Sequence, residues 1–266
     1  MTDLAARLRA AGCVFAEDEA RILLDQQYAV DELESAVARR VAGEPLEHIV
    51  GWVDFGDVRL HVGPGAFIPR QRSLFLAAQV ISAVKPGDVF VEAYAGVAPL
   101  AAAVSHAAGA RVHAVEYDPA AAEYAARNLP DGDVHVGESL HPLPADLRGQ
   151  VDVIAAVPPY VPDGALDAMP SEARDHEPRA THRGGSDGLD HVRRLIDEAR
   201  DWLTPGGVLL VELHRDQAPT AIGHARAAAY AATTVTGQDG HTAVLRARQP
   251  RGGDEETRQP EGRDER

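Results

Sequence analysis

The sequence predicts an α/β fold in which a parallel β-sheet is covered by helices on both faces. From residue 87 onward, apolar runs of strand length recur, namely DVFVEAY, RVHAVEY, VDVIAAV and GVLLVEL. Helix-like segments such as PAAAEYAARNL and HVRRLIDEARDWL lie between these runs. Strands that alternate with helices form parallel sheets, and continuous apolar runs are typical of strands that are buried on both faces.

The residues before this region predict a small helical unit followed by a β-hairpin. Residues 3–43 place apolar and charged side chains at helical spacing, as in EDEARILLDQ and VDELESAVARRVAG, and Gly43 is suited to end the last helix. VGWVDFGDVRLHVGPGAFIP then alternates in short segments around a turn near Gly56 and Asp57, which is typical of a hairpin. The apolar segment SLFLAAQVISAV predicts the first helix of the α/β region.

The end of the chain predicts a closing antiparallel pair and a polar tail. YAATTVTG and HTAVLRAR flank a turn at Gln238-Asp239-Gly240, and the following stretch RGGDEETRQPEGRDER is polar enough to stay disordered. We therefore divide the chain into four parts: a helical N-terminal domain (1–48), a β-hairpin linker (49–72), the α/β domain (73–248) and a disordered polar tail (249–266).

Composition and charge narrow the class of function. The 266 residues carry 26 basic and 41 acidic side chains, a net charge of −15, which argues against nucleic-acid binding as the main activity. Cys13 is the sole cysteine, so neither a disulfide nor a thiolate metal cluster is expected, and the scattered histidines lack the paired spacing of a zinc helix. Without a signal peptide or a long apolar run, the sequence predicts a cytoplasmic protein that contacts no membrane.

Candidate site residues follow the predicted strands, because ligands of open α/β sheets bind beyond the carboxyl ends of the strands. Glu116 comes about 20 residues after the first loop, the distance expected of a carboxylate that binds a ribose. Four strand ends together predict a nucleoside-type pocket: Glu92, Tyr94 and Gly96 at the first; Glu116 and Tyr117 at the second; Glu138 and Ser139 at the third; and Val157, Pro158, Pro159 and Tyr160 at the fourth.

Each of these features also has a structural interpretation. Glu116 alone is more often a solvated acid at a strand end, and the Pro-Pro-Tyr turn can be a rigid corner with a packed tyrosine. The order and spacing of all four strand ends favour the functional interpretation, because unrelated strand ends would seldom supply them together.

Two longer stretches carry a resemblance to a known family. GEPLEHIVGWVDFGDVRLHVGPGAFIPR resembles the linker hairpin of the HemK/PrmC-type protein-glutamine N(5)-methyltransferases, and EPRATHRGGSDGLDHVRRLIDEARDWLTPGGVLLVEL resembles their insertion after the catalytic turn. The similarity covers roughly residues 10–245 and is closest to a branch whose substrate is not assigned. It implies a Rossmann-like, seven-stranded class I methyltransferase domain at residues 73–248, preceded by a small helical domain and a β-hairpin linker.

The resemblance also implies roles for individual residues. S-adenosyl-L-methionine would be the cofactor, and Glu116 would hold its ribose hydroxyls. The turn from Val157 to Tyr160 would receive the acceptor amide, and Arg70, Glu177 and Pro178 would lie on the substrate side of the pocket. The implied partner is a protein substrate, such as a release factor or another glutamine-bearing protein, and the implied enzyme is a monomer without a metal.

The cofactor loop departs from the family pattern of an acid followed by several glycines. This chain reads Glu-Ala-Tyr-Ala-Gly-Val-Ala-Pro at residues 92–99, so only Gly96 remains. We expect Tyr94 and Val97 to occupy space that the ligand needs, with about 1–3 kcal/mol of strain wherever either requires a positive φ. Pro99 is expected in the first turn of the next helix, where it removes one N–H donor from an anion-binding helix start.

The catalytic turn departs from the family as well, because Val157 stands where the family has an asparagine that orients the target amide. Losing one such polar contact costs about 10²–10³-fold in rate. Asn128, the sole asparagine, is predicted in the helix after Glu116 and cannot substitute for it.

Three hypotheses follow. The first is an active methyltransferase that acts on a glutamine amide. The second is a methyltransferase-fold protein with impaired catalysis that acts as a binding or scaffold protein. The third is a methyltransferase with a different acceptor, for which an apolar Val157 pocket would be suited. Fold alone does not decide among them.

Overall fold

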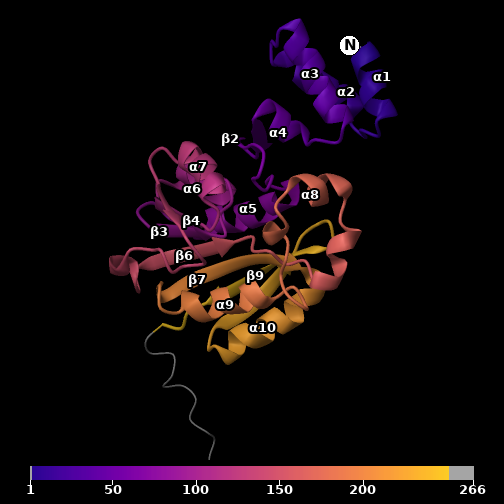
Figure 1. Ribbon diagram of the computed structural model, residues 1–266. Helices are drawn as coiled ribbons and strands as arrows, with labels where there is room; N and C mark the ends of the chain where they lie inside the picture. The colour runs from indigo at the N-terminus through magenta and orange to yellow at the C-terminus, as the bar shows by residue number, and fades with distance from the viewer. Residues whose placement is uncertain (1, 252–266) are drawn as a thin grey trace, which may run out of the picture.

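The computed structural model describes residues 2–251 and begins with four short helices that pack on one another (Figure 1). Leu8, Leu23 and Val37 are fully buried in the small core that these helices share, and Cys13 is buried beside them. The predicted glycine stop is observed, since Gly43 has φ +98° just after the third helix. The helices are α1 (Thr2–Ala10), α2 (Ala16–Asp25), α3 (Val30–Val41) and α4 (Leu46–Val50).

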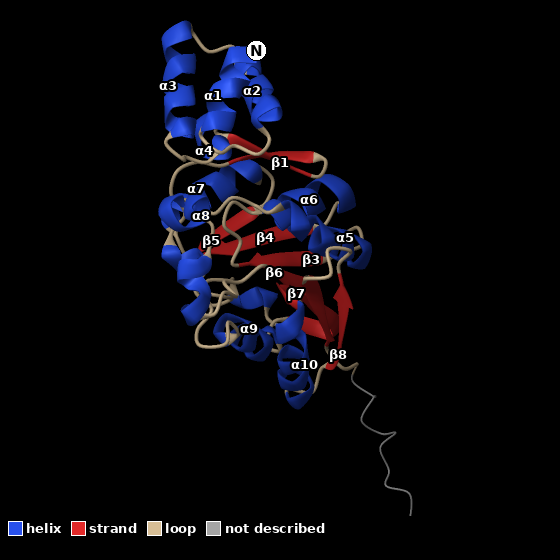
Figure 2. Ribbon diagram, turned by 90° about the vertical axis from the view of Figure 1, so that its right-hand side faces the viewer, coloured by secondary structure: helices blue, strands red, loops and turns tan. Residues whose placement is uncertain are grey.

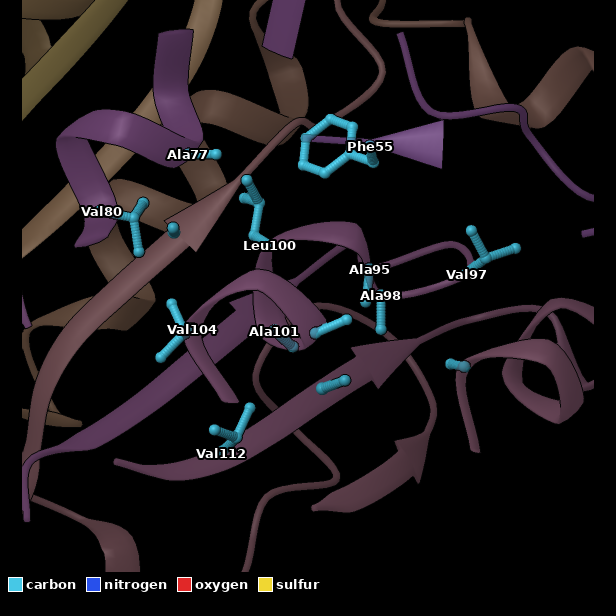
Figure 3. Packing of buried hydrophobic residues seen from close by; sticks show 14 of the residues in the cluster. Phe55, Ala77, Val80, Ala95, Val97, Ala98, Leu100, Ala101, Val104 and Val112 are labelled. Carbon is cyan, nitrogen blue, oxygen red and sulfur yellow. The ribbon is translucent and has the colours of Figure 1, made fainter. Parts of the chain in front are cut away.

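A β-hairpin connects the helices to the rest of the chain. Its strands are β1 (Trp52–Phe55) and β2 (Val58–His61), and Phe55 pairs with Val58 across the predicted turn, where Gly56 has φ +60°. The buried side chains of Phe55 and Leu60 belong to the same core cluster as Leu100, as Figure 3 shows for Phe55 and Leu100. The hairpin is therefore packed onto the α/β part of the molecule.

Seven strands form the central sheet, in the order β5-β4-β3-β6-β7-β9-β8. The first five strands in this order run parallel, and β9 pairs antiparallel with both β7 and β8. The α/β fold with seven strands is thus confirmed, including the closing pair. The strands are β3 (Val89–Ala93), β4 (Arg111–Glu116), β5 (Asp133–Val136), β6 (Val151–Ala156), β7 (Leu203–His214), β8 (Ala231–Thr236) and β9 (Thr242–Arg248).

Helices cover both faces of this sheet (Figure 2). One face packs on α5, α6 and α7, and the other on α9 and α10. Alternate residues of β3 point to opposite faces of the sheet, so Phe90 belongs to the core beneath α5, α6 and α7 and Val91 to the core beneath α9 and α10. The long helices are α5 (Leu74–Ala83), α6 (Pro99–Ala108), α7 (Pro119–Asn128), α9 (Asp190–Ala199) and α10 (Ala218–Ala227).

Short helical turns complete the described chain, several of them in the segment between β6 and α9. These turns are η1 (Gln71–Ser73), η2 (Ala145–Leu147), η3 (Asp163–Ala168), α8 (Ser171–His176), η4 (Arg179–Thr181) and η5 (Arg215–Gln217). The helix predicted to run through HVRRLIDEARDWL ends earlier, at Ala199, because Trp202 and Leu203 are buried where β7 begins. Most of the tail predicted at 249–266 lies outside the described residues.

Candidate functional site

One cavity of about 860 Å³ opens at the carboxyl ends of the central strands. All of the residues singled out from the sequence line it: Arg70, Glu92, Tyr94, Gly96, Glu116, Tyr117, Glu138, Ser139, Val157, Pro158, Pro159, Tyr160, Glu177 and Pro178. The loop around Gly96 and the turn at Tyr160 therefore share a single hollow. Their individual contacts differ from the sequence expectations in several places.

The loop between β3 and α6 is held in an unusual backbone conformation. Tyr94 has φ +53°, Gly96 +55° and Ala98 +61°. Left-handed backbone costs a residue with a side chain about 1–3 kcal/mol, so two of these positions are strained. The strain expected at Tyr94 is observed, whereas Val97 does not have a positive φ and Ala98, which the sequence did not single out, does.

Val97 lines the cavity as well. Its side chain is only 1% exposed and belongs to the same core cluster as the apolar residues of α6. Asn128 holds this loop from outside: its Nδ2 donates to the carbonyl oxygens of Val97 at 2.8 Å and His61 at 3.0 Å, and its Oδ1 accepts from the N–H of His61 at 2.7 Å. The single asparagine thus joins the loop to the hairpin.

Glu92 lies in the core behind the loop. Its carboxylate accepts hydrogen bonds from the N–H groups of Leu100 at 3.2 Å and Ala101 at 2.7 Å, at the start of α6. Burial raises the pKa of Glu92 to about 8, against the effect of those two hydrogen bonds. Pro99 occupies the first position of α6 as predicted, but the N–H donors of this helix start are bound by the protein's own Glu92, so a ligand carboxylate would find these donors taken.

Glu116 lies at the end of β4 and faces the same loop. Its Oε2 accepts from the N–H of Gly96 at 2.6 Å and its Oε1 from the N–H of Asp118 at 2.8 Å. Burial raises its pKa although both hydrogen bonds favour the ionised form. Each carboxylate oxygen has further acceptor capacity, so Glu116 can stabilise the loop and still bind hydroxyl groups from the cavity.

Two buried hydroxyls near this end of the cavity make no hydrogen bond to a described residue. They are Tyr94 Oη and Ser139 Oγ. The Tyr94 ring lies edge-on to His191 with centroids 5.3 Å apart, and burial raises the pKa of its phenol. Glu138 pairs instead with Arg194 of α9, and Tyr117 is 69% exposed. Buried polar groups without partners are costly, so Tyr94 and Ser139 mark where a polar ligand would gain hydrogen bonds.

The turn after β6 is fixed through Tyr160. Its hydroxyl accepts from Arg72 Nη2 at 3.0 Å and donates to Glu212 Oε1 at 3.3 Å, and its carbonyl accepts from Gln217 Nε2 at 2.9 Å. Burial, then the nearby Glu212 carboxylate, raises the pKa of Tyr160 to about 12. Val157, at the start of the turn, is half-buried and packs against the core.

Sequence reasoning missed Arg72, Glu212 and Gln217. Glu212 lies near the end of the apolar run GVLLVEL, so the strand-end rule that found Glu116 could have found it. Arg72 and Gln217 lie in short helical turns, where no periodic pattern indicates a direction for the side chain.

The segment beyond the turn closes the other end of the cavity. Glu177 is buried with its side chain 1% exposed, and it accepts from Arg70 Nη2 at 2.6 Å and from the N–H of Ile68 at 3.3 Å. His182 Nε2 lies 3.1 Å from Glu177 Oε2. Arg70 and Glu177, both predicted as substrate residues, are thus bound to each other at the cavity wall.

Within residues 2–251, no group of three or more metal-binding side chains is close enough to hold a metal ion, and no helix there could span a membrane. The polar side chains that line the largely apolar hollow include carboxylates, hydroxyls, guanidinium groups and imidazoles.

No family model matches the chain, but relatives and solved structures do. It is 40% identical to the release factor glutamine methyltransferase of Streptomyces coelicolor over 68% of this chain and 66% of that one. It is 36% identical to the enzyme of the same name from Corynebacterium glutamicum over 71% of this chain and 69% of that one. The chain thus spans about two thirds of the length of the relatives it matches.

Solved structures share the fold. A methyltransferase from Pyrococcus furiosus superimposes with a TM-score of 0.56 at 18% identity, over 82% of this chain and 99% of that one. An E. cuniculi complex responsible for methylation of the eRF1 termination factor gives a TM-score of 0.51 at 15% identity, over 70% of this chain and 99% of that one. From its sequence relatives, the chain belongs to the release factor glutamine methyltransferase family.

Proposed function

We propose that the protein transfers a methyl group from S-adenosylmethionine to the side-chain amide of a glutamine in a release factor. The observation that carries this proposal is the single cavity in which the Gly96 loop, Glu116, Ser139 and the Val157–Tyr160 turn meet. Cofactor-side and acceptor-side groups must share one hollow for direct transfer, because such catalysis consists mainly of positioning.

The residues at the Glu116 end are suited to an adenosyl sulfonium ligand. A Cβ built on Gly96 would meet nothing within 4 Å, so there is open space above the loop. Tyr94 Oη and Ser139 Oγ are buried and lack hydrogen bonds to described residues. We assign Glu116 to binding the ribose hydroxyls of the ligand. The hydroxyl groups of Tyr94 and Ser139 would bind other polar atoms of the ligand, and Tyr117 and Glu138 would lie at the rim of the cavity. S-adenosylmethionine supplies the electrophilic methyl group when bound.

The turn after β6 forms the acceptor end. The backbone carbonyls of Val157 and Pro158 can accept hydrogen bonds from an amide N–H, and Pro159 restricts the backbone between them and Tyr160. Arg72 and Glu212 fix Tyr160 as a rigid wall. Arg70 and Glu177, bound to each other beside Pro178, shape the mouth through which a glutamine side chain would enter.

Two observations favour the second hypothesis, a binding protein with impaired catalysis. Glu92 occupies the helix start that could otherwise bind the carboxylate of the cofactor, and Val157 offers no polar side chain to the acceptor. Such a protein would bind the release factor without methylating it. The two functions differ in whether the cofactor binds.

Calorimetric titration with S-adenosylmethionine is the first test. We expect saturable binding that a Glu116→Gln variant weakens by about tenfold or more, corresponding to about 1.4 kcal/mol. Glu123→Gln, an exposed acid on α7 outside the cavity, is the matched control and should bind like the native chain. At 100 times its Kd the cofactor should add about 2.7 kcal/mol to the free energy of unfolding. No binding at millimolar cofactor would exclude the transferase.

Methyl transfer itself is tested with an unmethylated bacterial release factor as the probe. Mass spectrometry of the digested product should find one added methyl group on a single glutamine. We propose that the protein is a monomer, and light scattering on the same samples measures its oligomeric state. Because the proposed acceptor is a release factor, we also propose that the reaction takes place in the cytoplasm. Cofactor binding without transfer to a release factor would favour a different acceptor.

A further inference from the structure

His182 is a buried polar side chain at the acceptor end of the cavity that the mechanism above does not use. It lines the cavity, it is 6% exposed, and neither nitrogen of its ring makes a hydrogen bond to a described residue. Nε2 is fully enclosed by protein, so a ligand in the cavity could restore hydrogen bonding to this ring only through Nδ1.

The backbone places His182 directly beside the catalytic turn. The N–H of Val161, one residue beyond Tyr160, donates to the carbonyl of His182 at 2.9 Å, and the N–H of Gly184 donates to the carbonyl of Val161 at 2.9 Å. The ring lies edge-on to Phe67, with centroids 5.7 Å apart. His182 is thus held on the wall that adjoins the turn, by backbone bonds and by an aromatic contact.

The neighbouring polar side chains of this wall already have partners. Arg70 donates to Glu177, Arg72 donates to Tyr160, and Thr181 Oγ1 donates to the carbonyl of Pro178 at 2.7 Å. Val157 has no polar atom in its side chain. Arginine cannot accept a hydrogen bond, so His182 is the side chain of this group that has no hydrogen-bond partner among the described residues and can still accept one from the N–H of a substrate amide.

Glu177 determines which ring nitrogen is available. Its Oε2 lies 3.1 Å from His182 Nε2, although the two are not aligned as a hydrogen bond. A carboxylate at that distance favours the tautomer with its proton on Nε2, which leaves the lone pair on Nδ1. Nδ1 is then a hydrogen-bond acceptor, and Nε2 is turned toward the protein.

We propose that His182 positions the acceptor by accepting a hydrogen bond from its amide N–H through Nδ1, with Glu177 fixing the tautomer. This inference rests on the proposed function and names a further residue that contacts the substrate. A backbone carbonyl of the turn accepts one amide N–H and His182 accepts the other. The nitrogen lone pair is thereby left free, and His182 supplies the polar contact that the Val157 side chain cannot make.

Substitutions that keep or remove the acceptor atom test this role in the full-length protein. His182→Leu should lower kcat/KM with the release factor by about 10²-fold, without changing the affinity for S-adenosylmethionine. His182→Asn, whose amide oxygen attaches at the same carbon as Nδ1, should stay within about tenfold of the native value. His141→Leu, a histidine with an exposed side chain outside the cavity, is the matched control.

A rescue experiment separates positioning from a purely structural role. Val157→Asn places an amide at a second position of the cavity lining, in the turn beside His182, so we expect it to restore most of the activity that His182→Leu loses. A structural defect would not be repaired from that position, and melting temperatures of all variants report folding directly. His182→Leu activity equal to native, or loss in His182→Leu that Val157→Asn leaves uncorrected, would overturn the proposal.

A measurement that needs no turnover keeps this inference distinct from the proposed function. The ¹⁵N resonance of His182 Nδ1, assigned by its loss in His182→Asn, should shift when N-acetylglutamine N-methylamide is added to the native protein. A shift without methyl transfer to any release factor would support the role of His182 in binding the amide and would reject the release factor as the acceptor. Transfer without a shift at saturating amide would reject His182 and retain the function.

Discussion

At the scale of single residues, the site depends on carboxylates that are buried against the protein's own backbone. The sequence placed Glu92 and Glu116 near the ends of two strands, and both line one cavity. It could not show that Glu92 turns inward to Leu100 and Ala101 while Glu116 reaches Gly96, because a side chain's direction depends on the packing around it. The strain at Tyr94 could be anticipated from the missing glycines, whereas Ala98 could not.

Glu92 makes the stability depend on pH. Its pKa is about 8 in the folded protein and about 4.5 in the unfolded chain, so between these values the folded state retains a proton that the unfolded state has lost. The free energy of unfolding should therefore fall as pH rises through this window, by up to about 1.4 kcal/mol per pH unit from this group. Urea unfolding at pH 5, 6, 7 and 8 should show that Glu92→Gln removes this part of the slope. Parallel curves for both proteins would contradict the assignment.

Tyr160 should contribute to stability as well as to the cavity wall. Tyr160→Phe removes the donor to Glu212 Oε1, and Glu212 Oε2 already makes no hydrogen bond to a described residue. Leaving a buried carboxylate with fewer partners costs about 1–3 kcal/mol, so we expect a loss of that size in urea unfolding. Tyr117→Phe is the control, since the Tyr117 side chain is exposed. Equal stability of the two variants would show that Arg72 alone satisfies Glu212.

At the scale of elements, the strands were predictable from the sequence, whereas the end of α9 and the contacts of α7 with the loop and the hairpin were not. Apolar runs identified β3, β4, β6 and β7 because parallel strands are buried on both faces. The end of α9 was misplaced because Trp202 continues the apolar pattern of the helix while packing at the start of the next strand. The side-chain hydrogen bonds that connect α7 to the β3–α6 loop and to the hairpin come from one residue, Asn128. Hydrophobic periodicity does not indicate such hydrogen bonds.

Asn128 should therefore couple hairpin, loop and cofactor affinity. Asn128→Ala deletes two hydrogen bonds to His61 and one to Val97, which removes one of the contacts that hold the strained Tyr94–Ala98 loop. We expect a loss of about 1–3 kcal/mol in stability together with weaker binding of S-adenosylmethionine. Differential scanning calorimetry and isothermal titration measure the two effects. Arg127→Ala, one residue earlier, is the control. If Arg127→Ala also lost stability and cofactor affinity, the effects of Asn128→Ala could not be assigned to the hydrogen bonds of its amide.

At the scale of the whole molecule, the N-terminal helices are tied to the segment that covers the cavity. Composition and periodicity predicted the helical unit, but nothing in the sequence indicated which of its charges would be buried. Arg40 of α3 is that charge, with its side chain 10% exposed: it donates to Glu19 of α2 at 2.6 and 3.1 Å and to Glu172 of α8 at 3.3 Å. The neighbouring carboxylates raise its pKa further, so it remains a cation.

The two ion pairs of Arg40 should have very different energies. Arg40→Met leaves Glu19 buried without its partner, which typically costs about 3–5 kcal/mol, whereas Glu172→Gln alters a half-exposed pair and should cost less than about 1 kcal/mol. Because Glu19 lies on α2, the loss in Arg40→Met affects the packing of the N-terminal helices, and calorimetry should report it as a lower melting temperature. The Glu172→Gln protein should keep the native profile. Comparable losses in both variants would mean that the contact with α8, rather than the pair with Glu19, provides most of the stabilisation by Arg40.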